Sequence, residues 1–192
     1  MKTLKDFGFG KRSIEDSIYF EVTEMVDGLL AREGDILIGT DFNAPIINIL
    51  WQMVANSRFT PEDSEGMKMV DKVSTIFTVG MAVEQIPFII NKLFPSLTGF
   101  KAKTDAWKGI TSYLRHIVKQ HEADFDPDNP KDFIDVYLTE IYKQKDSQDY
   151  NIEDLLMCIF DFFVAGTETS STTLKWIVLY LTIHQDVQER CK

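Results

Sequence analysis

The strongest constraint on the fold of this chain is a long helical pattern whose centre is built from poor helix formers. The pattern is helical from Asn151 to His184, and its middle reads Ala165-Gly166-Thr167-Glu168-Thr169-Ser170-Ser171-Thr172-Thr173. Glycine and short hydroxyl or β-branched residues rank below alanine in helices, and together they cost roughly 3–4 kcal/mol here relative to an alanine run. Such local conflicts tend to occur where function outranks stability, so this segment is where we expect the chemistry of the protein.

Composition limits the classes of protein to which the chain can belong. Its 192 residues, 44% of them hydrophobic, are enough for one large domain with a real core or for part of a bigger one. The formal charge of −10 argues against a nucleic-acid partner, because phosphate binding needs a basic surface. Cys158 and Cys191 form no disulfide framework, which indicates a reducing compartment. No run of 18 apolar residues occurs, so we do not expect the chain itself to cross a membrane.

Helical patterns follow one another along the chain and strand patterns are scarce, which predicts a mainly α fold. The run Thr60-Pro61-Glu62-Asp63 combines a capping residue, a proline and two acids, which is a strong signal for a helix start. Asn151, followed by acids in the first turn, is the predicted cap of the last helix. The remaining expected helices run from Ser13 to about Gly34, from Pro45, from Thr60 to about Gly80, from Thr104, and from Lys131 to about Tyr142.

Residues 81–100 form an apolar segment broken by Pro87 and Pro95. One interpretation is a buried loop, or short helices, packed against the core. The other is an exposed apolar patch that contacts a membrane or a lipophilic ligand. The sequence alone leaves both open.

The last helix carries a face that suits a flat ligand. At 100° per residue, one broad face collects Asp161, Phe162, Ala165, Thr169, Thr172 and Trp176, with Gly166 at its edge. Ala165 and Gly166 remove side-chain bulk, and the Thr169 hydroxyl could bond back to the Ala165 carbonyl or release it to widen the helix. The alternative is close packing between two core helices through the small residues Gly166 and Ser170.

Other motifs carry less weight. Gly8-Phe9-Gly10-Lys11 follows no predicted strand and lacks the full glycine spacing of a phosphate loop, so we interpret it as a turn. The histidines 116, 121 and 184 include no i, i+4 pair and nothing near them completes a zinc set. Cys158 lies on the apolar side of the last helix and is expected to be a small core residue. The sequence therefore predicts no metal-ligating residue.

The weak helix centre resembles a known family. Ala165-Gly166-Thr167-Glu168-Thr169-Ser170 fits the pattern [Ala/Gly]-Gly-x-[Asp/Glu]-Thr-[Thr/Ser] of the long distal helix of cytochrome P450 haem-thiolate monooxygenases. Segments 4–13, 130–135, 171–174 and 184–188 resemble animal microsomal, family-2-like members in the same order, so the likeness spans essentially the whole chain. The resemblance implies the central helical portion of the cytochrome P450 fold, ending just after the distal helix.

The same comparison shows which family features the sequence lacks. Neither cysteine stands in the Phe-x-x-Gly-x-x-x-Cys loop that ligates haem iron, and the Glu-x-x-Arg and Trp-x-x-x-Arg segments are absent. We therefore expect residues 1–192 to be an internal part of a cytochrome P450 domain whose ends are both missing. The haem b cofactor would take its axial thiolate from outside this chain, and the fragment alone would be inactive.

The resemblance assigns roles to particular positions. Thr169 is expected to hydrogen-bond dioxygen and hold a distal water, while Glu168 feeds protons to that site. Ala165 and Gly166 would let the haem approach the helix. The substrate pocket is expected near Asp161, Phe162 and Val164, and its membrane-facing roof at Phe88, Ile89, Phe94 and Leu97.

The implied activity is insertion of one oxygen atom from dioxygen into a lipophilic small molecule. Electrons would come from NADPH through NADPH-cytochrome P450 reductase, with cytochrome b5 as an optional further partner. The implied location is the cytoplasmic face of the endoplasmic reticulum membrane. The alternative is a truncated helical protein without catalysis that binds lipophiles or a partner.

Overall fold

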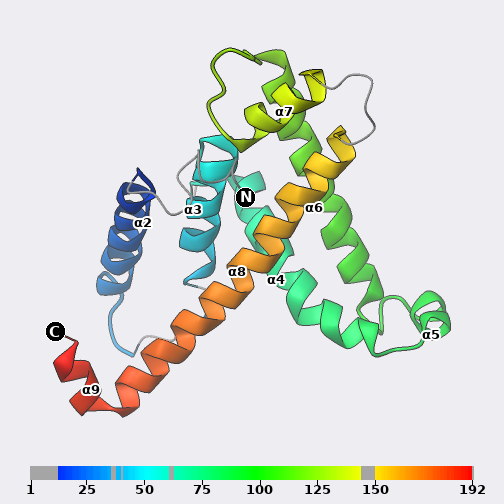
Figure 1. The fold of residues 1–192 in the computed structure, drawn as a ribbon. Helices are drawn as coiled ribbons and strands as arrows, with labels where there is room; N and C mark the ends of the chain where they lie inside the picture. Colours follow the sequence, from blue (N-terminus) through cyan, green and yellow to red (C-terminus); the bar gives the residue numbers. More distant parts are fainter. Residues whose placement is uncertain (1–12, 36–37, 40, 61–62, 144–149, 192) are drawn as a thin grey trace.

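The computed structural model of the chain describes residues 13–35, 38–39, 41–60, 63–143 and 150–191 (Figure 1). Across these ranges the regular secondary structure is helical and contains no strand, so the mainly α prediction is confirmed. The helices are α2 (Ser13–Leu30), α3 (Asn43–Ala55), α4 (Ser64–Glu84), α5 (Phe88–Leu93), α6 (Phe100–Ala123), α7 (Phe133–Lys143), α8 (Ile152–Ile183) and α9 (Gln185–Arg190). Residues 4–12, which carry part of the family likeness and the predicted turn at 8–11, lie outside the described ranges.

Of two predicted helix caps, one is confirmed and the other lies three residues further along the chain. The Asn151 side chain accepts a hydrogen bond from the Asp154 backbone N–H at 2.9 Å, which confirms the predicted cap of α8. α4 is capped by Asp63, whose carboxylate accepts from the backbone N–H groups of Glu65 and Gly66. The predicted start at Thr60 was therefore three residues too early, because the carboxylate of Asp63 supplies the cap.

The predicted start of the helix after the apolar segment was also wrong. α6 begins at Phe100, and Gly99 before it has a φ of 82°, a left-handed conformation that glycine adopts without strain. Thr104 lies inside the helix, where its hydroxyl donates to the Phe100 carbonyl at 2.8 Å. The threonine that resembled a cap is thus bonded to its own helix one turn back.

Trp51 of α3 lies at the centre of the core. Its side chain is 1% exposed, and its ring stacks on Phe59 with centroids 5.1 Å apart. Phe163 of α8 packs on the same ring at 5.1 Å. α8 crosses the middle of the molecule between α3 on one side and the α4/α6 pair on the other (Figure 1). The long helix is therefore held from two sides along its N-terminal half.

A buried amide connects the three helices that surround the core. Asn43 of α3 donates from Nδ2 to the Ser74 hydroxyl of α4 at 2.7 Å, and its Oδ1 accepts from the Ser171 hydroxyl of α8. Asn43 is 2% exposed and Ser171 is fully buried. Because polar groups in such a place need partners, this network defines how α8 sits against α3 and α4.

Candidate functional site

The centre of α8 is a continuous helix despite its poor composition. The Thr169 hydroxyl donates to the Ala165 carbonyl at 2.6 Å, and the Thr173 hydroxyl donates to the Thr169 carbonyl at 2.8 Å. Of the two arrangements that the sequence left open for Thr169, the structure shows the back-bonded one. Side-chain hydroxyls therefore occupy the backbone carbonyls at the point where the helix is weakest.

One side of this segment is open. Asp161, Ala165 and Thr169, which follow one another at intervals of four residues, are all exposed, and so are Thr172 and Trp176. Glu168 is half-buried at the edge of this open face, and its Oε1 lies 3.4 Å from the Thr172 hydroxyl, which donates to it. The open face thus carries threonine hydroxyls and, at its edge, the Glu168 carboxylate, close to Ala165, whose side chain is only a methyl group.

The opposite side of the same segment is packed. Phe163, Thr167 and Ser171, also four residues apart, are buried against the core. Gly166 faces α3, where an added Cβ would lie 2.9 Å from Cδ1 of Leu50. Close helix packing at Gly166 is therefore present, as the alternative interpretation required, but Ser170 is exposed and takes no part in it.

Two of the residues expected near a substrate pocket lie apart from the open face. Phe162 is half-buried, and its ring meets Phe133 of α7 edge-on with centroids 5.4 Å apart. Val164 is also half-buried and packs against the core cluster. Only Asp161, of the three, lies on the exposed face with Ala165 and Thr169.

Cys158 behaves as a core residue. It is half-buried and packs against the core cluster, as the sequence predicted. Burial, reinforced by the charges of Asp161 and Asp154, raises the pKa of the thiol above its ordinary value. A raised thiol pKa disfavours the thiolate, which is the nucleophilic and metal-binding form.

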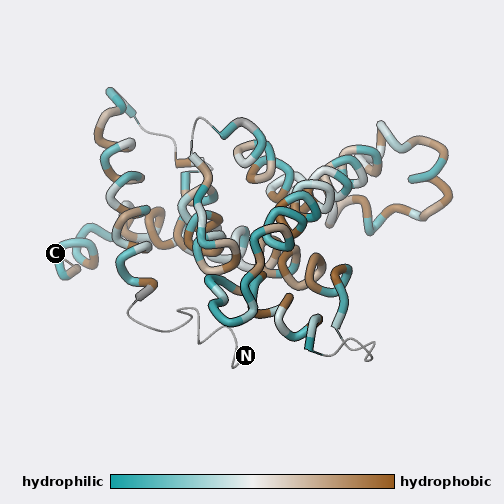
Figure 2. Tube along the Cα trace, turned by 90° about the horizontal axis from the view of Figure 1, so that it is seen from above, coloured by the Kyte–Doolittle hydropathy of each residue, from teal (hydrophilic) through white to brown (hydrophobic). Residues whose placement is uncertain are grey.

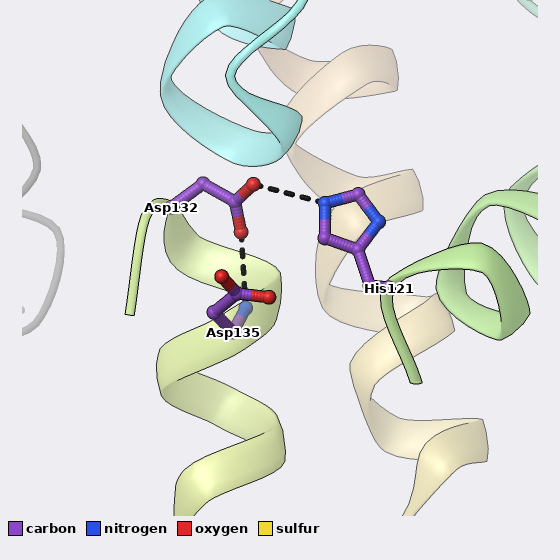
Figure 3. A group of neighbouring side chains, drawn as sticks. All are labelled: His121, Asp132 and Asp135. Atoms are coloured by element: carbon purple, nitrogen blue, oxygen red, sulfur yellow. Dashed lines mark hydrogen bonds and ion pairs between the residues drawn. The ribbon is translucent and has the colours of Figure 1, made fainter. Parts of the chain in front are cut away.

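His121 lies in a cluster that sequence reasoning missed. Its imidazole and the carboxylates of Asp132 and Asp135 offer ligand atoms that all lie within 4.8 Å of one another (Figure 3). The three positions share no periodic spacing, because His121 lies in the last turn of α6 and the two acids lie at the start of α7. Only the turn between these helices brings them together. The other histidines, His116 and His184, are exposed.

Residues 85–99, the part of the predicted apolar segment 81–100 that lies between α4 and α6, are at the far end of the α4/α6 pair and stand away from the rest of the molecule (Figures 1 and 2). Its large side chains are exposed, among them Phe88 at 68%, Ile89 at 70%, Phe94 at 57% and Leu97 at 87%. Asn91 holds the segment in place, since its buried Nδ2 donates to the Val83 and Ile86 carbonyls at 3.0 and 3.1 Å. For these four side chains the buried-loop interpretation was wrong.

The described helices include none that is both long and apolar enough to span a bilayer.

Comparisons with known proteins assign the class. The cytochrome P450 family model matches residues 1–192, so the chain belongs to the cytochrome P450 family. A solved zebra fish cytochrome P450 structure with progesterone superimposes with a TM-score of 0.79. It is 21% identical and covers 98% of this chain and 43% of that chain, and at this identity the likeness concerns the fold.

Individual relatives show which members of the family the chain is similar to. Cytochrome P450 2J3 of Rattus norvegicus is 32% identical over 198 residues, which are 99% of this chain and 39% of that protein. Cytochrome P450 2C8 of Homo sapiens is 34% identical over 199 residues, covering 97% of this chain and 39% of the relative. The chain thus spans about two fifths of the length of these curated relatives.

Proposed function

We propose that the protein is a haem-thiolate monooxygenase that inserts one oxygen atom from dioxygen into a lipophilic small molecule. The observation that carries this proposal is the open face at the centre of α8, where the family motif places Thr169 and Glu168 beside the small residue Ala165. The proposal concerns the whole protein, in which residues 1–192 are an internal part that supplies the distal helix and the substrate-access region. By itself this part is expected to be inactive.

The open face fits a flat cofactor such as haem b. Ala165 is exposed and adds only a methyl group to the helix surface, so a planar group could lie against the backbone there. Gly166 acts on the packed side of the helix, because its missing Cβ lets α8 lie close to Leu50 of α3. When bound, the haem supplies oxygen activation, and its thiolate ligand would come from a cysteine outside this chain.

The side chains on this face would deliver protons. The Thr169 hydroxyl donates to the Ala165 carbonyl, so its oxygen lone pairs remain available to accept from a water on the exposed side. Glu168, whose Oε1 accepts from the Thr172 hydroxyl, would relay protons to that water as the neighbouring acid. Asp161, one turn before Ala165, is the group we propose to face the substrate, whereas Phe162 and Val164 would shape the pocket from the packed side.

Thr169→Ala is expected to uncouple electron use from product formation in the full-length enzyme. Loss of the hydroxyl damages the proton path, so hydrogen peroxide released per substrate consumed should rise several-fold while NADPH oxidation continues. Thr173→Ala is the matched control, because Thr173 makes the same back-bond one turn further along the helix. Parent-level coupling in Thr169→Ala would show that the role assigned to Thr169 is wrong.

We also propose that segment 85–99 rests on the cytoplasmic face of the endoplasmic reticulum membrane. Its exposed Phe88, Ile89, Phe94 and Leu97 support this, since exposed apolar patches mark membrane or partner contacts. Electrons would come from NADPH through the flavoprotein NADPH-cytochrome P450 reductase, with cytochrome b5 as an optional donor. These partners follow from the family resemblance.

The double substitution Phe94→Ser with Leu97→Ser is expected to weaken binding to phosphatidylcholine vesicles by at least about tenfold in an anchor-free form of the protein. The reason is that two large apolar side chains no longer insert into the bilayer. Vesicle co-sedimentation measures this directly. Val26→Ser with Leu30→Ser removes exposed apolar side chains from α2 instead and should leave binding unchanged. Equal binding by both double variants and the parent would exclude the segment as the membrane contact.

A further inference from the structure

The turn between α6 and α7 is closed by a contact between His121 and the first turn of α7 (Figure 3). The Asp132 carboxylate caps α7, since its Oδ1 accepts from the Asp135 backbone N–H at 3.0 Å. The Asp135 Oδ2 accepts in turn from the Lys131 backbone N–H at 3.0 Å. His121 Nε2 lies 2.9 Å from the other oxygen of Asp132, Oδ2. One imidazole therefore connects the end of α6 to the cap of α7.

Both contacts of His121 can be hydrogen bonds to acceptors at the same time when each ring nitrogen carries a proton. Nδ1 lies 3.0 Å from the Ile117 carbonyl oxygen, which can only accept, so this contact is a hydrogen bond when Nδ1 carries a hydrogen. Nε2 faces a carboxylate oxygen, which also accepts when it is ionised. Both contacts are satisfied together when the ring is the imidazolium and Asp132 is a carboxylate.

The pair is mostly buried and borders a cavity. The side chains of His121 and Asp132 are 19% and 3% exposed, and a cavity of about 190 Å³ opens beside them. The end of α3 contributes no charge to this cavity, because only Ala55 and its neighbour Asn56 line the cavity from there. The charged groups that line it are Asp124, Lys131, Asp132 and Asp135.

These surroundings act on the imidazole in opposite directions. Burial is the largest influence and lowers the pKa of His121, but the hydrogen bonds to Asp132 and the Ile117 carbonyl, with the charges of Asp132 and Asp135, raise it overall above 6.5. A folded pKa above the unfolded value means that the contact stabilises the fold in full below pH 6.5. That stabilisation is lost as pH rises through the folded pKa.

We propose that the α6–α7 turn is a proton-operated latch, in which doubly protonated His121 holds the Asp132 cap against the end of α6 and loss of the proton releases it. The neutral ring has one hydrogen for two acceptors, so it loses its hydrogen bond either to the Ile117 carbonyl or to Asp132, and its ion pair with Asp132 ends in both tautomers. Two acceptors then lie at hydrogen-bond distance without a hydrogen between them, and the turn opens. This inference is independent of the proposed function.

A metal ion is the competing occupant of the same three side chains. A metal would need the Nε2 lone pair and free carboxylate oxygens, as in sites built from histidine and carboxylates. Here Nε2 already meets Asp132, and both carboxylates hold backbone N–H groups at the start of α7. When His121 is doubly protonated, these contacts are satisfied without a metal ion, which favours the latch over a metal site.

Amide hydrogen exchange tests the latch on the protein as it stands. In peptides covering residues 117–123 and 132–137, exchange corrected for its intrinsic pH dependence should be at least about tenfold faster near pH 9 than near pH 6, the ratio expected for loss of a charge-assisted hydrogen bond. His116→Leu, an exposed histidine on the same helix, should behave like the parent. Corrected exchange that is equal at both pH values in the parent would overturn the proposal.

Two variants separate the proton from other causes. His121→Leu should exchange fast at both pH values. Asp132→Asn should exchange slowly at both, because the amide oxygen still caps α7 while the amide nitrogen donates to the neutral Nε2. Persistent pH dependence in Asp132→Asn, or protection that follows added Zn²⁺ at constant pH, would overturn the latch.

Discussion

Trp51→Ala is expected to lower the free energy of unfolding by about 3–5 kcal/mol, the range for truncating a large aromatic side chain in a core. Trp51 is 1% exposed and contacts aromatic rings from separate parts of the chain, Phe59 after α3 and Phe163 in α8, with both centroids 5.1 Å away. Its removal leaves a cavity between α3 and α8 that the backbone of two packed helices cannot close. The loss therefore includes both the transfer of the indole and the contacts of the rings around it.

Equilibrium urea unfolding followed by circular dichroism measures this loss. Tyr19→Ala on α2 is the control, because that ring is 71% exposed and its removal should change stability by no more than about 0.5 kcal/mol. If Trp51→Ala lost less than about 1 kcal/mol, the ring would not be at the centre of the core as described.

Asn43→Ala is expected to cost about 2–4 kcal/mol, because it leaves the hydroxyls of Ser171 and Ser74 without their partner. Ser171 is fully buried, so its hydroxyl has no access to water as a substitute. The effect should be concentrated in α8 around Thr167 and Ser171, where hydrogen exchange is expected to rise most. In this respect it differs from a general loosening of the core.

A double-mutant cycle identifies the contact itself. Asn43→Ala combined with Ser171→Ala should cost less than the sum of the two single losses, because the pair then leaves fewer buried groups unsatisfied. Gln52→Ala on the same helix removes a surface amide that donates to Asn56 and should cost little. Strict additivity of the two single losses would show that Asn43 and Ser171 are not coupled.

The helices themselves could be predicted because their signals are local. Asn151 and Asp63 cap the helices that follow them through hydrogen bonds to the next few residues, although the sequence placed the second of these caps three residues early, at Thr60. The prediction also failed where no side chain caps the helix, as at Gly99, whose left-handed backbone precedes α6. The back-bond from Thr169 to Ala165 is local too, and the sequence contained it as one of two options.

Sequence periodicity described the open face of α8 only in part. It correctly grouped Asp161, Ala165 and Thr169, but it placed Phe162 with them, while the structure turns that ring onto Phe133 of α7. A residue at the edge of a helical face can pack to either side, and the neighbour that decides lies on another helix. The same holds for Gly166, whose contact is Leu50 of α3.

By itself, the sequence determined the mainly α class, the extent and cap of α8 and the motif that identifies the family, because each depends on residues within a few positions of one another. The tertiary structure alone decided which side of α8 is buried, that segment 85–99 is exposed, and that His121 meets Asp132 and Asp135. These features rest on contacts between distant parts of the chain, such as Asn43 with Ser171, which are 128 residues apart. No periodic pattern encodes such pairs, since each is set by how whole helices pack to bury their apolar faces.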